Sequence, residues 1–207
     1  MKKIALLFTA ALAIGTFYSC TSSSESTETA TEESSAGLAD GTVNIDLAAS
    51  TVGWKGVMLG VKEHTGTVGV SEGTLSVKDG VIDGGKFVVD LSTIAPTDTV
   101  YDEEHTKEKL VGHLSSPDFF HVEQFPNATF EITGGTPSSV TGNLTIRDKT
   151  HEATVENVSV SEENGAKVIT GELTFNRKDF DVSFDVPVKD MVISDDVELD
   201  IKLVTQQ

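Results

Sequence analysis

The sequence has a single cysteine, Cys20, among its 207 residues. One cysteine excludes an intrachain disulfide, so a folded domain must be held together by its apolar core.

Long apolar runs are also scarce. The run at residues 4–14 is far shorter than the roughly 20 residues that a permanent transmembrane helix requires, and no other segment could span a bilayer.

Positively charged residues are also scarce. The chain has 15 Lys and Arg against 33 Asp and Glu, which gives a formal net charge of -18. Nucleic acid phosphates and anionic lipid headgroups are bound through clusters of Lys and Arg. We therefore expect no nucleic acid partner. The acidic surface is typical of a soluble domain, although a specific cationic partner remains an alternative.

The first residues have the three parts of an export signal. Lys2 and Lys3 precede the apolar run, small residues follow it, and Cys20 comes next, before a polar string of Thr and Ser. This arrangement is similar to a bacterial lipobox, in which the cysteine becomes the lipidated first residue of the mature protein. The sequence predicts a lipoprotein signal peptide at residues 1–19, lipidation of Cys20, and a protein anchored in the bacterial cell envelope, on its periplasmic face or at the cell surface.

Residues 20–41 are dominated by Ser, Thr, Glu and Ala, and Leu38 is the one large apolar side chain among them. Such a segment cannot bury a core and is predicted to be a disordered tether. One ordered domain is therefore expected at residues 42–207.

Apolar and polar residues alternate with period two through most of that domain, which is the mark of strands with one buried face. The segment at residues 180–184 is one such predicted strand. Many short alternating strands joined by Gly, Asn and Asp turns indicate an all-β antiparallel sandwich or barrel. One helix-like stretch, residues 102–114, interrupts them, either as a cap on a barrel end or as a surface excursion.

Two features that suggest chemistry have simpler explanations. Residues 69–73 match G-x-S-x-G, but a nucleophile elbow needs a helix directly after the serine, and a strand pattern follows here. We expect a hairpin turn instead.

The five histidines lack the close spacings of a zinc site. We predict no catalytic residues, no metal and no cofactor.

Several motifs resemble the YceI-like family in their order along the domain. They include the segments Trp54-Lys55-Gly56, Gly84-Gly85-Lys86-Phe87, Gly112-His113-Leu114, Phe125-Pro126-Asn127-Ala128 and Asn176-Arg177-Lys178-Asp179-Phe180, together with His64 and Gly66. Asp181 departs from the family, which commonly has glycine there. The resemblance implies an eight-stranded antiparallel lipocalin-like β-barrel with a short helical insertion. It also implies non-catalytic binding of a polyisoprenoid, such as a quinone or a polyprenyl carrier, in the barrel interior.

An eight-stranded barrel can either fill itself with side chains or hold one small ligand, and composition does not choose between these. A structural or adhesive lipoprotein with a solid core is therefore the alternative. For the ligand-binding case we predict a wall of inward-facing apolar residues and two polar candidates at the mouth that would orient a headgroup, His113 and Arg177. The predicted wall residues are Phe87, Val89, Leu91, Phe130, Ile132, Leu144, Phe175, Phe180 and Phe184.

Overall fold

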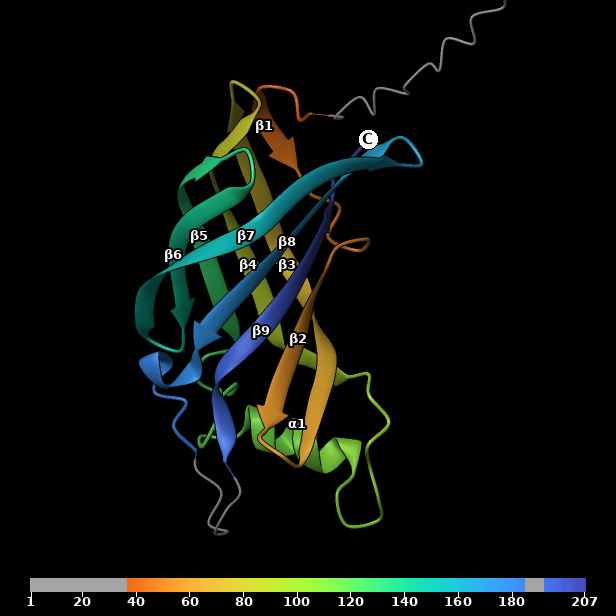
Figure 1. Ribbon diagram of the computed structural model, residues 1–207, viewed down its shortest axis with the longest axis vertical. Helices are drawn as coiled ribbons and strands as arrows, with labels where there is room; N and C mark the ends of the chain where they lie inside the picture. Colours follow the sequence, from red (N-terminus) through yellow and green to blue (C-terminus); the bar gives the residue numbers. More distant parts are fainter. Residues whose placement is uncertain (1–36, 185–191) are drawn as a thin grey trace, which may run out of the picture. The chain divides into compact units, whose positions relative to one another are not determined.

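The computed structural model describes residues 37–184 and 192–207. The predicted signal peptide, Cys20 and most of the predicted tether lie outside these residues. Figure 1 shows an antiparallel barrel with one short helix at its lower end. The elements are β1 (Gly41–Asn44), β2 (Thr51–Met58), β3 (Lys62–Lys78), β4 (Val81–Pro96), α1 (Lys107–Ser115), β5 (Asn127–Thr136), β6 (Ser139–Ile146), β7 (Lys149–Glu163), β8 (Ala166–Asn176), the 3-10 helix η1 (Arg177–Phe180) and β9 (Ile193–Val204).

The strands from β2 to β9 run up and down in sequence order, each hydrogen-bonded to the next. The sheet closes because β9 pairs with β2, with Thr51 opposite Lys202 and Gly56 opposite Val197. Eight strands therefore form the closed barrel. The ninth strand, β1, pairs with the last part of β3. The predicted eight-stranded antiparallel barrel with a helical insertion is confirmed.

Strand β3 is 17 residues long and borders three other strands. Its first part pairs with β2, its last part with β1, and most of its length with β4. Two shifts in the β3–β4 register, between Thr67 and Gly69 and between Val70 and Glu72, bend the strand without ending it. The G-x-S-x-G segment lies inside this bent strand, so the predicted hairpin turn at residues 69–73 is wrong.

The first strand begins near the start of the predicted ordered domain. Strand β1 begins at Gly41, one residue before the expected start. Leu38 is buried in the core, although it belongs to the predicted tether. Its burial is consistent with its being the one large apolar side chain of that segment.

The helical insertion caps the lower end of the barrel (Figure 1), and its Leu114 is packed against the core. It begins at Lys107, later than expected, because the Asp102 carboxylate accepts the backbone N–H groups of Glu104 and His105 at 2.8 and 2.7 Å in a turn. Thr106 then caps the helix by accepting the N–H of Lys109. No helix among the described residues is long and apolar enough to cross a membrane.

The predicted strand at residues 180–184 is also wrong. The chain forms η1 instead, with the Asn176 side chain accepting the N–H of Lys178 at its start. Asp181 ends it with a left-handed φ of 58°. The family's usual glycine adopts this conformation without strain, and Asp is among the few other residues that tolerate it. The next carbonyls bind Arg177 rather than a neighbouring strand.

Trp54 of β2 lies across Gly66 of β3, its partner in the register. A methyl group on Gly66 would overlap the indole ring and would stand 2.5 Å from the carbonyl oxygen of Ala95. The indole Nε1 donates to the carbonyl of Thr67 at 3.3 Å. Glycine is therefore required at position 66 because the ring occupies the space of a side chain.

Asp98 holds the connection between β4 and α1 against β3. Its carboxylate accepts the Tyr101 hydroxyl at 2.9 Å, the N–H of Thr65 at 3.1 Å, and lies 3.2 Å from Nδ1 of His64. Burial alone would raise the pKa of Asp98, but the hydrogen bonds from Val100, Tyr101, Thr65 and His64 outweigh it and lower the pKa. Burial and the adjacent carboxylate raise the pKa of Tyr101 to about 12.

We expect Gly66→Ala to destabilise the protein by about 1–3 kcal/mol, because the added methyl forces the indole or the backbone to move. Since Trp54 is the single tryptophan, its fluorescence in a urea titration reports the change directly. Gly112→Ala is the control, because an added methyl there meets no atom within 4 Å. Its expected effect is neutral or slightly stabilising. Equal stability of the two variants would contradict the packing argument.

We expect Asp98→Asn to cost about 1–3 kcal/mol at neutral pH, since it weakens charge-assisted hydrogen bonds in a nearly buried site. The Asp98 pKa is lower in the folded state, so its stabilisation is complete above the unfolded pKa of about 3.9 and is lost as the pH falls through the folded pKa. The difference in unfolding free energy between Asp98→Asn and wild type should therefore disappear in acid. Urea titrations at several pH values measure this difference, and Asp148→Asn, at an exposed position, is the control. A difference that persists in acid would refute the role of the Asp98 carboxylate.

Candidate functional site: an apolar cavity inside the barrel

The barrel encloses a cavity of about 220 Å³. All eight barrel strands contribute side chains to its wall, and Leu114 of α1 with Phe119 and Phe120 complete it at the lower end. Nearly all of the lining residues are apolar. The polar lining residues among those described are Thr129, Thr170, Arg177 and Ser194.

The cavity lining includes most of the predicted wall residues, and their contact with a ligand stays a prediction. Alternation places every second side chain of a strand on the inner face, and seven of the nine predicted wall residues line the cavity. These seven are Phe87, Val89, Leu91, Phe130, Ile132, Leu144 and Phe175. The other two, Phe180 and Phe184, do not line it, because their segment is not a strand.

Phe180 and His113 support the wall from outside. The Phe180 ring packs edge-on against Phe175 and His151, with centroids 5.5 and 5.1 Å apart. His113 packs edge-on against Phe119 at 4.8 Å and Phe184 at 4.4 Å. His113 is therefore one layer behind the lining residue Phe119. As a ligand residue it stays a prediction.

The two ends of the cavity differ in character. At the upper end, the core residues Leu38, Ile45 and Val77 are buried beyond the cavity wall. They are apolar and tightly packed. At the lower end, the lining residues include Arg177 and Ser194. Their polar atoms bind within the protein, because the Arg177 guanidinium donates to backbone carbonyls and the Ser194 hydroxyl accepts the N–H of Asp196. The cavity surface is thus apolar along its length, with the Arg177 charge held at the end near α1.

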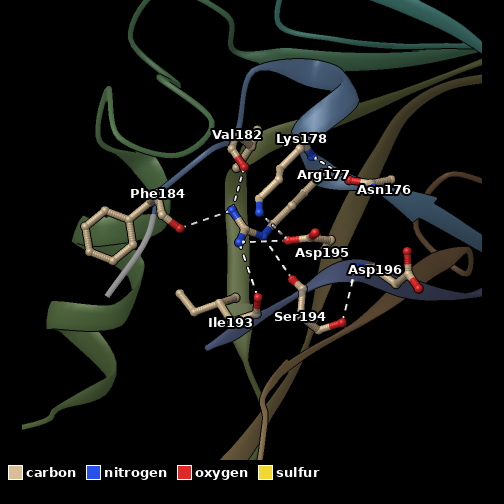
Figure 2. Close-up of polar contacts among 9 residues, drawn as sticks. All are labelled: Asn176, Arg177, Lys178, Val182, Phe184, Ile193, Ser194, Asp195 and Asp196. Carbon is tan, nitrogen blue, oxygen red and sulfur yellow. Dashed lines mark hydrogen bonds and ion pairs between the residues drawn. The ribbon is translucent and has the colours of Figure 1, made fainter. Parts of the chain in front are cut away.

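Arg177 fixes the lower end through every N–H of its guanidinium group (Figure 2). Nε donates to the carbonyl of Ser194 at 2.9 Å, and one terminal nitrogen donates to the carbonyls of Val182 and Phe184 at 2.7 and 3.2 Å. The other donates to the carbonyl of Ile193 and to the Asp195 carboxylate at 3.3 and 3.5 Å. These contacts join the chain after η1 to the first residues of β9.

Arg177 is 1% exposed. A buried charge is costly unless hydrogen bonds replace its hydration, and here four carbonyl dipoles and one carboxylate do so. All five N–H groups are used within the protein. In this arrangement Arg177 offers a ligand its charge but no further hydrogen bond, so its predicted contact with a headgroup stays a prediction.

Arg147, in the turn between β6 and β7, ties two other lower segments together. One of its terminal nitrogens donates to the carbonyl of Asp181 at 2.7 Å and to that of Phe119 at 3.3 Å. Its guanidinium also lies over the Phe125 ring, 5.8 Å from the centroid. The aromatic end of the cavity is therefore positioned by an arginine that sequence analysis did not select.

Titratable groups with clear pKa shifts lie outside the cavity lining. Asp98 and Tyr101, which share the cluster with His64, are absent from the wall. The described residues contain no group of three or more His, Cys, Asp or Glu side chains placed to hold a metal ion. The cavity wall supplies an apolar surface rather than an acid, a base or a nucleophile.

Other wall residues were not selected from the sequence. Trp54, Phe119 and Phe120 are the largest side chains among them. Trp54 belongs to an alternating strand, so the same period-two pattern could have identified it. Phe119 and Phe120 lie in an irregular connection, where no periodicity indicates which side chains face inward.

Comparisons with known proteins agree with this architecture. Residues 43–205 match the YceI-like domain. A UPF0312 protein of Staphylococcus aureus (strain N315) is 35% identical over 105 residues, which cover 46% of this chain and 60% of that relative. The aligned part thus spans less than two thirds of this curated relative.

Two solved structures share the fold. BcnA of Burkholderia cenocepacia is 21% identical with a TM-score of 0.62, and the match covers 79% of this chain and all of that one. A polyisoprenoid-binding domain from Saccharophagus degradans, implicated in plant cell wall breakdown, is 13% identical with a TM-score of 0.57, covering 81% and 99%. With the domain match spanning the whole barrel, the chain belongs to the YceI-like family.

Proposed function

We propose that this protein binds a long apolar isoprenoid lipid, of the quinone or polyprenyl type, inside its barrel and does so without catalysis. The observation that carries the proposal is the cavity of about 220 Å³ with its almost wholly apolar wall. Family membership and the shared fold of the polyisoprenoid-binding domain from Saccharophagus degradans support it.

The cavity favours this function over that of a structural or adhesive lipoprotein. Protein interiors are normally packed about as densely as organic crystals, with few voids larger than a water molecule. A barrel whose role is only to fold would fill this space with its own side chains. An apolar cavity left open in the core is instead the usual form of a small-molecule site.

The arrangement of polar groups predicts the direction of the ligand. The apolar plug of Leu38, Ile45 and Val77 at the upper end suits a hydrocarbon tail. The positive charge of Arg177 at the lower end suits a polar head. We propose that the tail enters first and that the head stays near α1.

Burial of apolar surface would supply the affinity. A prenyl chain that buries roughly 400 Å² gains about 10 kcal/mol gross at about 25 cal/mol per Å². The loss of translational, rotational and chain freedom offsets part of this gain.

We also propose that the protein acts at the cell envelope, exported and anchored by a lipidated Cys20, and that it transports, stores or senses its lipid there.

We expect native mass spectrometry of the full chain, purified from a bacterial host, to show a bound lipid that organic extraction identifies as an isoprenoid. Added prenyl quinone should quench the fluorescence of Trp54, which lies in the cavity wall. A protein that purifies without a bound lipid and shows no quenching by added quinone would argue for the solid-core alternative.

The matched variants for this test stand three residues apart on β5. Ala128 is buried in the cavity wall, whereas Glu131 is exposed on the outer face. Ala128→Phe fills part of the cavity and should weaken quinone binding at least about tenfold, roughly 1.4 kcal/mol. Glu131→Phe adds the same ring outside and should bind as wild type does. Melting curves confirm that both variants are folded.

We expect Arg177→Lys to destabilise the protein by about 3–5 kcal/mol, because an ammonium cannot satisfy the carbonyls that the planar guanidinium binds. The neighbouring Lys178 is 43% exposed and pairs with Asp195 at 2.9 Å. Lys178→Ala is therefore the control, with an expected cost of at most about 1 kcal/mol. Urea unfolding measures both, and equal costs would show that Arg177 does not clamp the lower end.

A further inference from the structure

Exposed apolar side chains gather at the lower end of the barrel. Among the described residues, five large apolar side chains are exposed, and four of them lie on connections at this end. They are Leu59 (53% exposed), Val61 (50%), Val100 (48%) and Val192 (55%). We call these four residues the apolar rim.

The rim is held by backbone contacts and by the Asp98 cluster. The N–H of Leu59 donates to the carbonyl of Val192 at 2.8 Å, and the N–H of Val61 closes the β2–β3 turn on Met58 at 3.0 Å. The N–H of Val100 donates to Asp98, whose carboxylate is bound to β3 next to that turn. The apolar side chains therefore project from a fixed surface.

The turns at the upper end have a different composition. They are formed by Asp79-Gly80, Pro137-Ser138 and Asn164-Gly165, which are ordinary polar turn residues. The β2–β3 turn at the lower end has Leu59 and Val61 instead. Exposed apolar residues that cluster on one face mark an interaction surface more often than single scattered ones do.

The rim lies next to the cavity wall in the chain. Met58 pairs with Ile193 in the register of β2 and β9, and Ile193 lines the cavity. Val192, the residue before it, belongs to the rim. The rim and the cavity wall therefore meet along the chain at Val192 and Ile193, on the side of β2 and β9.

We propose that the apolar rim inserts into the surface of a lipid bilayer, so that lipid passes between the bilayer and the cavity without crossing water. The inference rests on the proposed function, because a water-insoluble ligand must come from a membrane. The net charge of -18 opposes attraction to anionic lipid. Contact therefore depends on apolar insertion, and it should be stronger with zwitterionic than with anionic bilayers.

The first experiment locates the rim in the bilayer. Cys20→Ser leaves the full chain without cysteine, so a cysteine introduced at Val61 can carry one polarity-sensitive dye. With phosphatidylcholine vesicles, the dye emission should shift to the blue and brighten. The same dye on Ser138→Cys, at the upper end, should stay in water. A dye at position 61 that remains aqueous would overturn the proposal.

The second experiment measures transfer. Vesicles of phosphatidylcholine loaded with a prenyl quinone are mixed with the protein, and quenching of Trp54 is followed with time. The triple variant Leu59→Ser, Val61→Ser, Val192→Ser should slow quenching about tenfold while its final extent stays the same. Leu47→Ser, at the fifth exposed apolar position, is the control and should transfer at the wild-type rate.

The two experiments separate the two proposals. Insertion of the rim without any quenching in the wild type would uphold bilayer contact and reject the quinone as ligand. Full quenching at an unchanged rate in the triple variant would uphold lipid binding and overturn the role of the rim. Surface substitutions of this kind seldom unfold a protein, and a melting curve of the triple variant confirms that it is folded.

Discussion

Closure of an eight-stranded sheet sets the space that the rest of the molecule must fill. Strand number fixes the width of a barrel, and at eight strands the interior is either filled by side chains or open enough for one ligand. Here the side chains from all eight strands leave about 220 Å³ unfilled. The binding site is therefore a property of the whole sheet, and the loops decide how it is reached.

At the lower end, irregular segments of the chain close the apolar interior. Irregular segments have backbone carbonyls without strand partners, and buried carbonyls need donors. Arg177 supplies five N–H groups from one side chain, so a single residue satisfies the carbonyls of Val182, Phe184, Ile193 and Ser194. Arg147 performs a similar task for Phe119 and Asp181. Arginine suits such sites because its donors point in fixed directions.

The strands could be predicted from the sequence because alternation is a local signal. That signal located most of the wall, including Phe87, Phe130 and Leu144, without any knowledge of strand pairing. It failed at residues 180–184, where the alternation of Phe180, Val182 and Phe184 is the same as in a strand. The decisive contact there is with a side chain earlier in the chain, Arg177. Alternation does not record such a contact.

The void itself could not be predicted from composition, since the same apolar residues can pack solidly or leave a gap. The bend of β3 at residues 69–73 was missed for a related reason. Glycine near a polar residue is common both in hairpin turns and in bulges, and the choice depends on the register with β4. Features that depend on pairing between strands far apart in sequence required the structure.

The pairing of β2 with β9 has a consequence for folding. These strands lie at opposite ends of the domain, with Thr51 opposite Lys202, so the barrel closes only when almost the whole domain is present. Contacts of such long sequence range slow folding, because the chain loses much entropy before they form. Until β9 docks, the inward faces of the other strands form an open, curved apolar surface. A ligand that binds only the closed barrel would therefore also stabilise the β2–β9 pairing.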